Sequence, residues 1–299
     1  MIFDSESVFE DNVITVLKQH GWKDGVLRYP TEQDLLDNWK GILYRNNNDI
    51  DRLGKYPLTD GEMAQIIEQI ETLRTPLALN SFVNGRTVSI TRDNKEDVAH
   101  FGKEISLYIY DRKEIAGGKS TYQIAQQPVY PAKNKMLNSR RGDLVLLING
   151  MPLIHIELKK SGIPVSQATN QIEKYTHEGV FTGLFRLVQI FVAMNPDDAV
   201  YFANPGVDKF NPSYYFHWAD YNNEPICGGQ NPGKDEWKLF IGGTSGTAGL
   251  LSIPMAHQLI GFYTIADSAD GCLKVLRSYQ YIAANAISDV VRKLSLIHI

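Results

Sequence analysis

Two very apolar segments separated by one Asn-Gly pair constrain the fold of this chain more than any other part of its sequence. They span residues 144–148 and 153–158, on either side of Asn149-Gly150. Asn-Gly between apolar runs is a strong short-range signal for a β-hairpin, so we expect two buried, paired strands. At a period of two, one face of this hairpin is pure hydrocarbon and must lie in a core: Leu144, Leu146, Ile148, Ile154, Ile156 and Leu158.

The opposite face of the hairpin carries its ionisable side chains. Asp143 precedes the first strand, and His155, Glu157 and Lys159 alternate along the second. Antiparallel pairing would bring Asp143 and Glu157 together, where two carboxylates repel each other unless a cation such as Mg²⁺ joins them. A metal held there would lower the pKa of an attacking water, and Lys159 would orient that water or neutralise charge on a phosphate. The pattern therefore predicts a phosphodiesterase site.

The register of the hairpin decides whether this site can form. A plain two-residue turn at Asn149-Gly150 would place Asp143 opposite Ile156 and turn Glu157 to the other face. We therefore expect a one-residue change of register. It would come from a three-residue loop with Gly150 in a left-handed bulge, or from a bulge within one strand.

Each part of the pattern also has an ordinary structural interpretation. Glu-x-Lys is common on solvated strand faces, and an Asp before a strand is commonly a turn residue. The apolar strands favour catalysis, because a charge is costly to bury without a use. The chain has a net charge of -4, yet the surroundings of the hairpin are basic and could hold phosphates: Lys133, Lys135, Arg140, Arg141, Lys159 and Lys160.

The rest of the chain predicts one α/β domain with a mixed sheet flanked by helices, followed by a change of texture near residue 204. Helical spacing and capping signals predict helices at 7–20, after Thr31, after a capping box from Thr59 to Glu62, and at 166–178. Strands are expected at 87–91, 105–110, 122–130 and 188–194, besides the hairpin. Residues 204–235 have the composition of an irregular arm, and 236–260 contain the linker-like GGTSGTAG. Helical patterns resume at 254 and over 272–293.

Gln171 and Tyr175 follow the hairpin and share one helix face, four residues apart. Together with Asp143, Glu157 and Lys159, they resemble the N-terminal PD-(D/E)xK nuclease domain of type I restriction R (HsdR) subunits, in which ExK is followed by a QxxxY helix. The resemblance covers nearly all of the chain up to residue 293. It implies a restriction-endonuclease-like fold over 1–235 and Mg²⁺-dependent hydrolysis of double-stranded DNA, as in a type I site-specific deoxyribonuclease.

The resemblance also implies roles for single residues. Asp143, Glu157 and the backbone carbonyl of Leu158 would bind the metal, and Asp143, Glu157 and Lys159 would be catalytic. Glu10, in a segment that resembles the opening helix of the family, would supply a supporting carboxylate. Supporting and DNA-handling roles are implied for Gln171, Tyr175, Arg140 and Arg141. His155 lies outside the family pattern, and we interpret it as a packing or supporting residue.

Residues 276–280, Leu-Arg-Ser-Tyr-Gln, resemble the adenine-reading Q motif that opens the motor domain of superfamily 2 translocases. Gln280 would contact the adenine of ATP, and 261–293 would begin a RecA-like motor domain. No phosphate-binding loop is found in the sequence, so we expect ATP binding and hydrolysis only in the full-length subunit. The final LSLIHI (294–299) is interpreted as a non-native end where the gene was cut off.

The expected partners are double-stranded DNA and the methyltransferase (HsdM) and specificity (HsdS) subunits, in the cytoplasm of a prokaryote and without a membrane. The two cysteines cannot form a disulfide framework, and the N-terminus has no signal-peptide pattern. Two alternatives stay open. One is a nuclease-like scaffold that docks the motor on the methyltransferase, and the other is a stand-alone Mrr-like or repair nuclease of the PD-(D/E)xK class.

Overall fold

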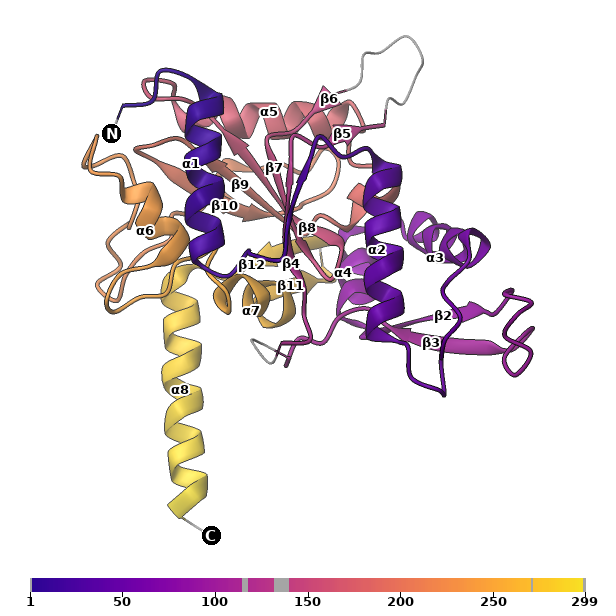
Figure 1. Cartoon of the computed structure of the whole chain (residues 1–299). Helices are drawn as coiled ribbons and strands as arrows, with labels where there is room; N and C mark the ends of the chain where they lie inside the picture. The colour runs from indigo at the N-terminus through magenta and orange to yellow at the C-terminus, as the bar shows by residue number, and fades with distance from the viewer. Residues whose placement is uncertain (1, 115–117, 132–139, 270, 298–299) are drawn as a thin grey trace.

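A mixed β-sheet of six strands lies at the centre of the computed structural model, which describes residues 2–114, 118–131, 140–269 and 271–297 (Figure 1). Its strands lie in the order β1-β4-β7-β8-β9-β10. β1 pairs with β4 and β8 with β9 in parallel, and the other neighbours are antiparallel. The bounds are Val26–Arg28, Tyr122–Gln126, Leu144–Ile148, Met151–Leu158, Ile190–Met194 and Ala199–Ala203. The predicted mixed α/β architecture is confirmed.

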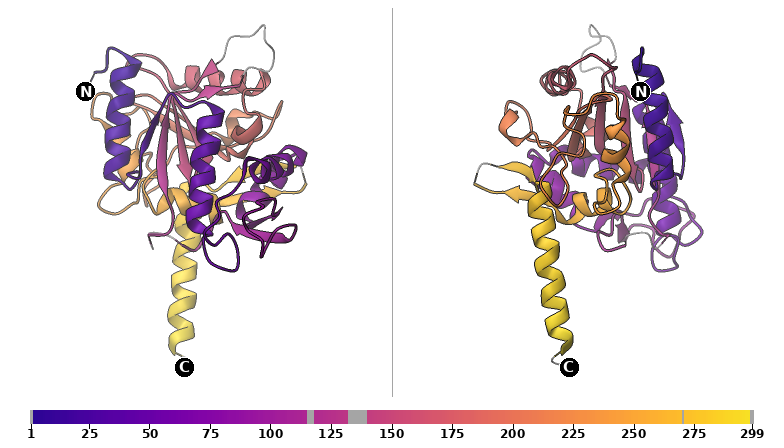
Figure 2. Two further views of the ribbon diagram at one scale, coloured as in Figure 1. Left: turned by 45° about the vertical axis from the view of Figure 1, so that its right-hand side comes forward. Right: turned by 90° about the vertical axis from the view of Figure 1, so that its left-hand side faces the viewer.

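Helices cover both faces of the sheet (Figures 1 and 2). α1 (Glu6–Gln19) and α2 (Glu32–Asn46) lie on one side, and α5 (Val165–His177) packs against β8 and β9 on the other. Ser5 caps the N-terminus of α1, because its side chain accepts a hydrogen bond from the backbone N–H of Val8. Because apolar residues recur at helical spacing, one side of α1 is buried against the core. The hairpin is thereby enclosed between two helical layers.

A smaller group of elements lies beside the sheet. It comprises α3 (Asp60–Thr72), α4 (Pro76–Asn84) and the antiparallel pair β2 (Thr87–Thr91) and β3 (Glu104–Tyr108). The predicted capping box at Thr59 and Glu62 is present. Glu62 also accepts a 2.6 Å bond from the buried Arg92, which bonds Asp97 at 2.9 Å. These ion pairs join helix and hairpin in a buried, fully partnered network, so we assign them a structural role.

The C-terminal third returns to the same core. The arm at 204–235 is largely irregular, with one 3-10 turn at η2 (Pro212–Tyr214), as expected. The segment 236–260, expected to be a linker, instead contains α6 (Glu236–Gly242) and the start of α7 (Met255–Phe262) and contributes fully buried side chains to the main core: Trp237, Phe240, Ile241, Leu250 and Leu251. A linker-like composition therefore does not mean a flexible linker here.

The last described elements are β11 (Thr264–Asp267), β12 (Cys272–Val275) and α8 (Ser278–Ile297). Expecting helix from residue 272 was wrong for the six residues before α8, of which the first four form a strand paired with β11. α8 projects away from the rest of the molecule (Figure 1). Nothing in the described residues shows a folded motor domain, so the expected RecA-like start stays a prediction.

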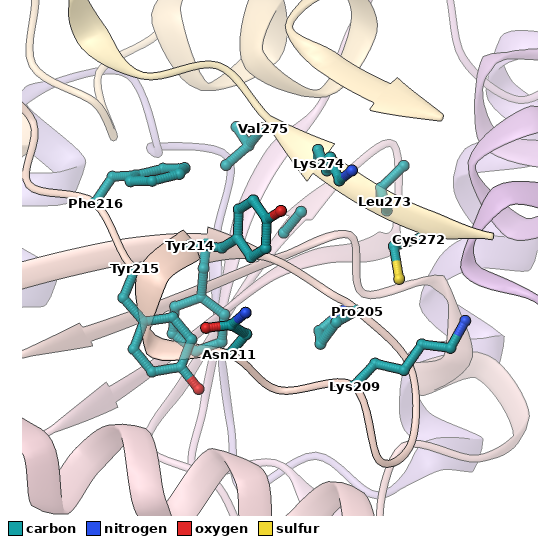
Figure 3. A pocket seen from close by; sticks show the side chains of 12 residues that line it. Pro205, Lys209, Asn211, Tyr214, Tyr215, Phe216, Cys272, Leu273, Lys274 and Val275 are labelled. Atoms are coloured by element: carbon teal, nitrogen blue, oxygen red, sulfur yellow. The ribbon is translucent and has the colours of Figure 1, made fainter. Parts of the chain in front are cut away.

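A small aromatic pocket lies between the arm and β12 (Figure 3). Its volume is about 50 Å³, and Tyr214, Tyr215 and Phe216 line one side of it. It contains none of the predicted catalytic residues. No helix among the described residues is both long enough and apolar enough to cross a membrane.

Candidate functional site

A β-bulge sets the register of the central hairpin. The turn contains two residues, Asn149 and Gly150, with positive φ angles of 52° and 84°. Next to the turn Leu147 pairs with Pro152, but the preceding residue of β7 pairs with Ile154. Leu153 is therefore an extra residue on β8. The expected three-residue loop is wrong, and the alternative expectation, a bulge within one strand, is confirmed.

The bulge brings the two predicted carboxylates to the same face. Beyond it, Leu144 pairs with Ile156, and the next step of this register sets Asp143 opposite Glu157. Asp143 Oδ2 accepts a 2.6 Å hydrogen bond from the backbone N–H of Leu158. This bond anchors Asp143 across the open end of the hairpin, beside the strand that carries Glu157.

Lys159 joins the carboxylates from the same strand. Its Nζ lies 3.5 Å from Glu157 Oε1 and 3.7 Å from Glu6 Oε1, and it donates a 2.9 Å bond to the carbonyl of Leu158. The Lys159 ammonium group therefore lies beside two of the three predicted metal ligands, the Glu157 carboxyl and the Leu158 carbonyl. The structure brings Asp143, Glu157, Leu158 and Lys159 together.

The electrostatics of the site are unfavourable for two carboxylates without a metal. Burial raises the pKa of Glu157 from 4.5 to about 8, and the attraction of Lys159 opposes this shift. Burial and the charge of Glu157 raise the pKa of Asp143 well above its ordinary value. Both carboxyl oxygens of Glu157 are buried without a hydrogen-bond partner among the residues that the structure describes.

Such oxygens fit a hard divalent cation, which satisfies carboxylate oxygens and compensates for their repulsion. Within the described residues, no cluster of three or more His, Cys, Asp or Glu side chains is arranged to hold a metal. The expected ligand set has two carboxylates and one backbone carbonyl, so it lies outside that kind of cluster. The donor set is of the type that leaves positions for water and phosphate oxygens.

Glu10 lies near this pair but is already hydrogen-bonded. Its Oε1 accepts a 2.6 Å bond from the Gln126 side chain, and both of its oxygens lie 3.3 Å from Gln127 Nε2. Burial raises the pKa of Glu10, and the charge of Glu10 in turn raises the pKa of Asp143. The backbone N–H of Gln127 also donates to the carbonyl of Asp143 at 2.7 Å. Sequence reasoning missed both glutamines, because nothing in the strand pattern distinguishes them.

Gln171 and Tyr175 connect α5 to the basic strand β6 (Arg140–Arg141), which pairs with β5 (Val129–Tyr130). The Gln171 side chain donates to the Tyr175 hydroxyl at 2.7 Å, and that hydroxyl donates to the carbonyl of Arg141 at 3.0 Å. Burial raises the pKa of Tyr175 to about 12, so its hydroxyl stays protonated. The pair therefore holds the strand that carries the two arginines.

The basic patch is only partly free to meet a phosphate. Arg140 forms two hydrogen bonds with Glu178, at 2.9 and 3.0 Å. The Arg141 guanidinium lies 5.8 Å from the ring centroid of Tyr29, which is exposed. Lys133 and Lys135 lie outside the described residues. Arg141 is thus the better candidate for a phosphate contact.

Gln280 lies at the start of α8. Its Oε1 accepts a 3.0 Å bond from the backbone N–H of Arg277, which caps the helix. The structure therefore gives Gln280 a local structural role, and its expected contact with adenine stays a prediction.

Comparison with known proteins identifies the family. A family model for the N terminus of type I restriction enzyme R proteins matches residues 4–210. The chain belongs to this family. Its relatives include the type I restriction enzyme SsaAORF53P endonuclease subunit of Staphylococcus saprophyticus, 29% identical over 295 residues. The SauCOLORF180P endonuclease subunit of Staphylococcus aureus is 29% identical over 289 residues.

These alignments cover 96% of the chain but 27% of each staphylococcal relative, so the chain spans about a quarter of their length. The EcoprrI endonuclease subunit of Escherichia coli is 28% identical over 318 aligned residues, which cover 96% of the chain and 91% of that protein. The match to the R-protein family includes the hairpin and α5 and ends in the arm.

Proposed function

We propose that this chain is the DNA-cleaving domain of the restriction subunit of an ATP-dependent type I restriction-modification system. Asp143, Glu157 and Lys159 would form its catalytic site. The observation that carries the proposal is the bulge at Leu153, which sets the buried Glu157, the partly buried Asp143 and one lysine on one face of the hairpin. A buried carboxyl group without hydrogen bonds destabilises a fold, and such groups cluster at functional sites.

Asp143, Glu157 and the carbonyl of Leu158 would hold Mg²⁺. When bound, this ion would lower the pKa of a coordinated water and neutralise negative charge on the phosphate. Lys159 contributes a positive charge and N–H donors on the same side, where they can orient a water or bond a phosphate oxygen. Glu10, held by two glutamine amides, would keep the surrounding field negative and so favour a cation.

DNA would be held by the elements beside this face. Through the carbonyl of Arg141, Tyr175 fixes the strand that presents Arg140 and Arg141, and Gln171 fixes Tyr175. Arginine side chains at this position can form charge-assisted hydrogen bonds with phosphates. This arrangement supports the DNA-handling role expected for the four residues.

The wider setting follows from the family and from the names of the relatives, which are endonuclease subunits. We infer a restriction-endonuclease-like fold, double-stranded DNA as substrate, and methyltransferase and specificity subunits as partners. ATP would be used only by the full-length subunit, whose motor would begin near Gln280. Residence in the prokaryotic cytoplasm completes the proposal.

Alanine substitutions in the complete complex test this function. Asp143→Ala, Glu157→Ala and Lys159→Ala should each abolish DNA cleavage, by at least about 100-fold. ATP hydrolysis and translocation should persist, because the substitutions touch no part of the motor. Glu68→Ala, which removes an exposed carboxylate on α3, is the matched control and should cleave normally.

Two results would contradict the proposal. Cleavage that persists in any of the three variants would remove that residue from the catalytic site. Simultaneous loss of cleavage, ATP hydrolysis and translocation would instead favour a scaffold that holds the complex together.

A further inference from the structure

His155 is completely buried on the same face of β8 as Glu157, two residues before it. Its Nδ1 lies 2.8 Å from the Tyr130 hydroxyl. The ring is enclosed by Tyr175, Phe181 and Phe191, at centroid distances of 6.5, 5.4 and 6.0 Å. Gly142 completes the enclosure, since a Cβ atom there would lie 2.9 Å from His155 Cε1. The imidazole is therefore held in one position.

The other ring nitrogen faces the candidate metal site. His155 Nε2 lies 3.3 Å from Glu157 Oε2. Neither atom has an aligned hydrogen-bond partner among the residues that the structure describes. The Glu157 carboxyl group also interacts with the side chains of Asp143 and Lys159.

The tautomer of His155 follows from its neighbours. The ring is completely buried, where a neutral imidazole that carries one N–H is favoured over a charged one. If the Tyr130 hydroxyl donates to Nδ1, the N–H lies at Nε2 and points at Glu157. The other tautomer would set a lone pair against an ionised carboxylate, which is repulsive. A carboxylate that binds a metal is ionised, so the metal-bound Glu157 selects a donor at Nε2.

We propose that His155 is a positioning residue, which donates from Nε2 to Glu157 Oε2 and is itself fixed by Tyr130. This inference rests on the proposed metal site. When His155 holds Oε2 of Glu157, Oε1 points toward Lys159 and is available as a metal ligand. Groups that hydrogen-bond a metal-binding carboxylate orient it, and their removal typically costs about 10- to 100-fold in metal affinity.

Packing alone explains the ring but not its polar atoms. A leucine or phenylalanine would fill the aromatic enclosure without the cost of burying two nitrogens. The Tyr130 hydroxyl repays that cost at Nδ1 only. The contact with Glu157 compensates for the burial of Nε2.

Mn²⁺ binding to the 299-residue chain tests the inference, measured near pH 8 by the loss of the free-ion electron paramagnetic resonance signal. His155→Leu should weaken Mn²⁺ binding by about 10- to 100-fold. His155→Gln, whose side-chain amide can donate near the Nε2 position, should restore it to within a few-fold. Tyr130→Phe should give an intermediate loss. Phe181→Leu perturbs the same enclosure without removing a donor, and should lose less Mn²⁺ affinity than His155→Leu does. Thermal unfolding of each variant monitors the fold.

Three outcomes would overturn the inference. Unchanged Mn²⁺ binding in His155→Leu would show that Glu157 needs no partner there. Equal losses in His155→Leu, His155→Gln and Phe181→Leu would reduce His155 to packing. If the unsubstituted chain and Asp143→Ala both fail to bind Mn²⁺, the proposed metal site is wrong, and this inference falls with it.

Discussion

Glu157 combines complete burial with two carboxyl oxygens that lack hydrogen bonds within the described part of the chain. Alternation along the strand was enough to predict its face and the presence of Lys159 on that face. The groups that contact its neighbours Glu10 and His155 were not predictable, because they come from distant segments: Gln126, Gln127 and Tyr130. At this scale a single sequence shows which side chains share an element, but not which distant ones meet them.

The raised pKa of Glu157 predicts how stability depends on pH. The unfolded chain releases this proton near pH 4.5, whereas the folded chain keeps it up to about pH 8. The folded state thus binds more protons in this window, and the free energy of unfolding falls as pH rises. Without divalent ions, the wild type should lose roughly 1–3 kcal/mol relative to Glu157→Gln between about pH 5 and pH 8.

Urea unfolding of both proteins at several pH values measures this difference. Titrations that the two proteins share cancel in the comparison. A difference that stays constant across the window would show that Glu157 is ionised in the folded chain at low pH.

The hairpin shows what can be read from sequence at the scale of an element. Its two strands and its change of register follow from the apolar pattern and from the chemistry of Asp143 and Glu157. The position of the bulge that changes the register could not be predicted, because nothing distinguishes Leu153 from the other apolar residues of its strand. The short strand β10 and the helix α4 were overlooked, although Thr75 and Pro76 are a standard start signal for a helix.

The two-residue turn that closes the hairpin depends on Gly150. This residue has a φ of +84°, and a Cβ atom there would lie 2.9 Å from the Cα atom of Trp39. Gly150→Ala should therefore lower the free energy of unfolding by roughly 1–3 kcal/mol. Gly246→Ala is the control and should be nearly neutral, because a Cβ atom there meets nothing within 4 Å. Equal stabilities of the two variants in chemical unfolding would contradict this account of the turn.

The molecule as a whole has one main core that extends past the expected domain boundary. Composition suggested a linker at 236–260, yet one of its glycines serves close packing: a Cβ atom at Gly249 would collide with the carbonyl oxygen of Ile241. Trp237 packs on Phe9 with ring centroids 5.2 Å apart, and the Trp22 indole donates to the carbonyl of Leu251 at 2.6 Å. Gly-rich composition alone cannot distinguish such packing from flexibility.

A chain that ends at residue 235 should therefore fold poorly. Removal of Trp237 and Leu251 exposes the inner side of α1, the helix that carries Glu10. Its melting temperature should fall by more than roughly 10 °C, or cooperative unfolding should disappear. A chain that ends at residue 276 loses only Arg277, α8 and the residues after it, and should melt within a few degrees of the full chain. Calorimetry measures the melting temperature of each truncated chain. Similar melting temperatures would support the domain boundary expected at residue 235.

The central claim is that the bulge at Leu153 lets Asp143 and Glu157 share one divalent cation. The most direct measurement is an anomalous difference map from a crystal of the chain grown with Mn²⁺. We predict a peak in direct contact with carboxyl oxygens of both residues and with the carbonyl of Leu158, and its absence from a Glu157→Gln crystal. A map with no Mn²⁺ between Asp143 and Glu157, at an ion concentration that fills other carboxylate sites, would contradict the account.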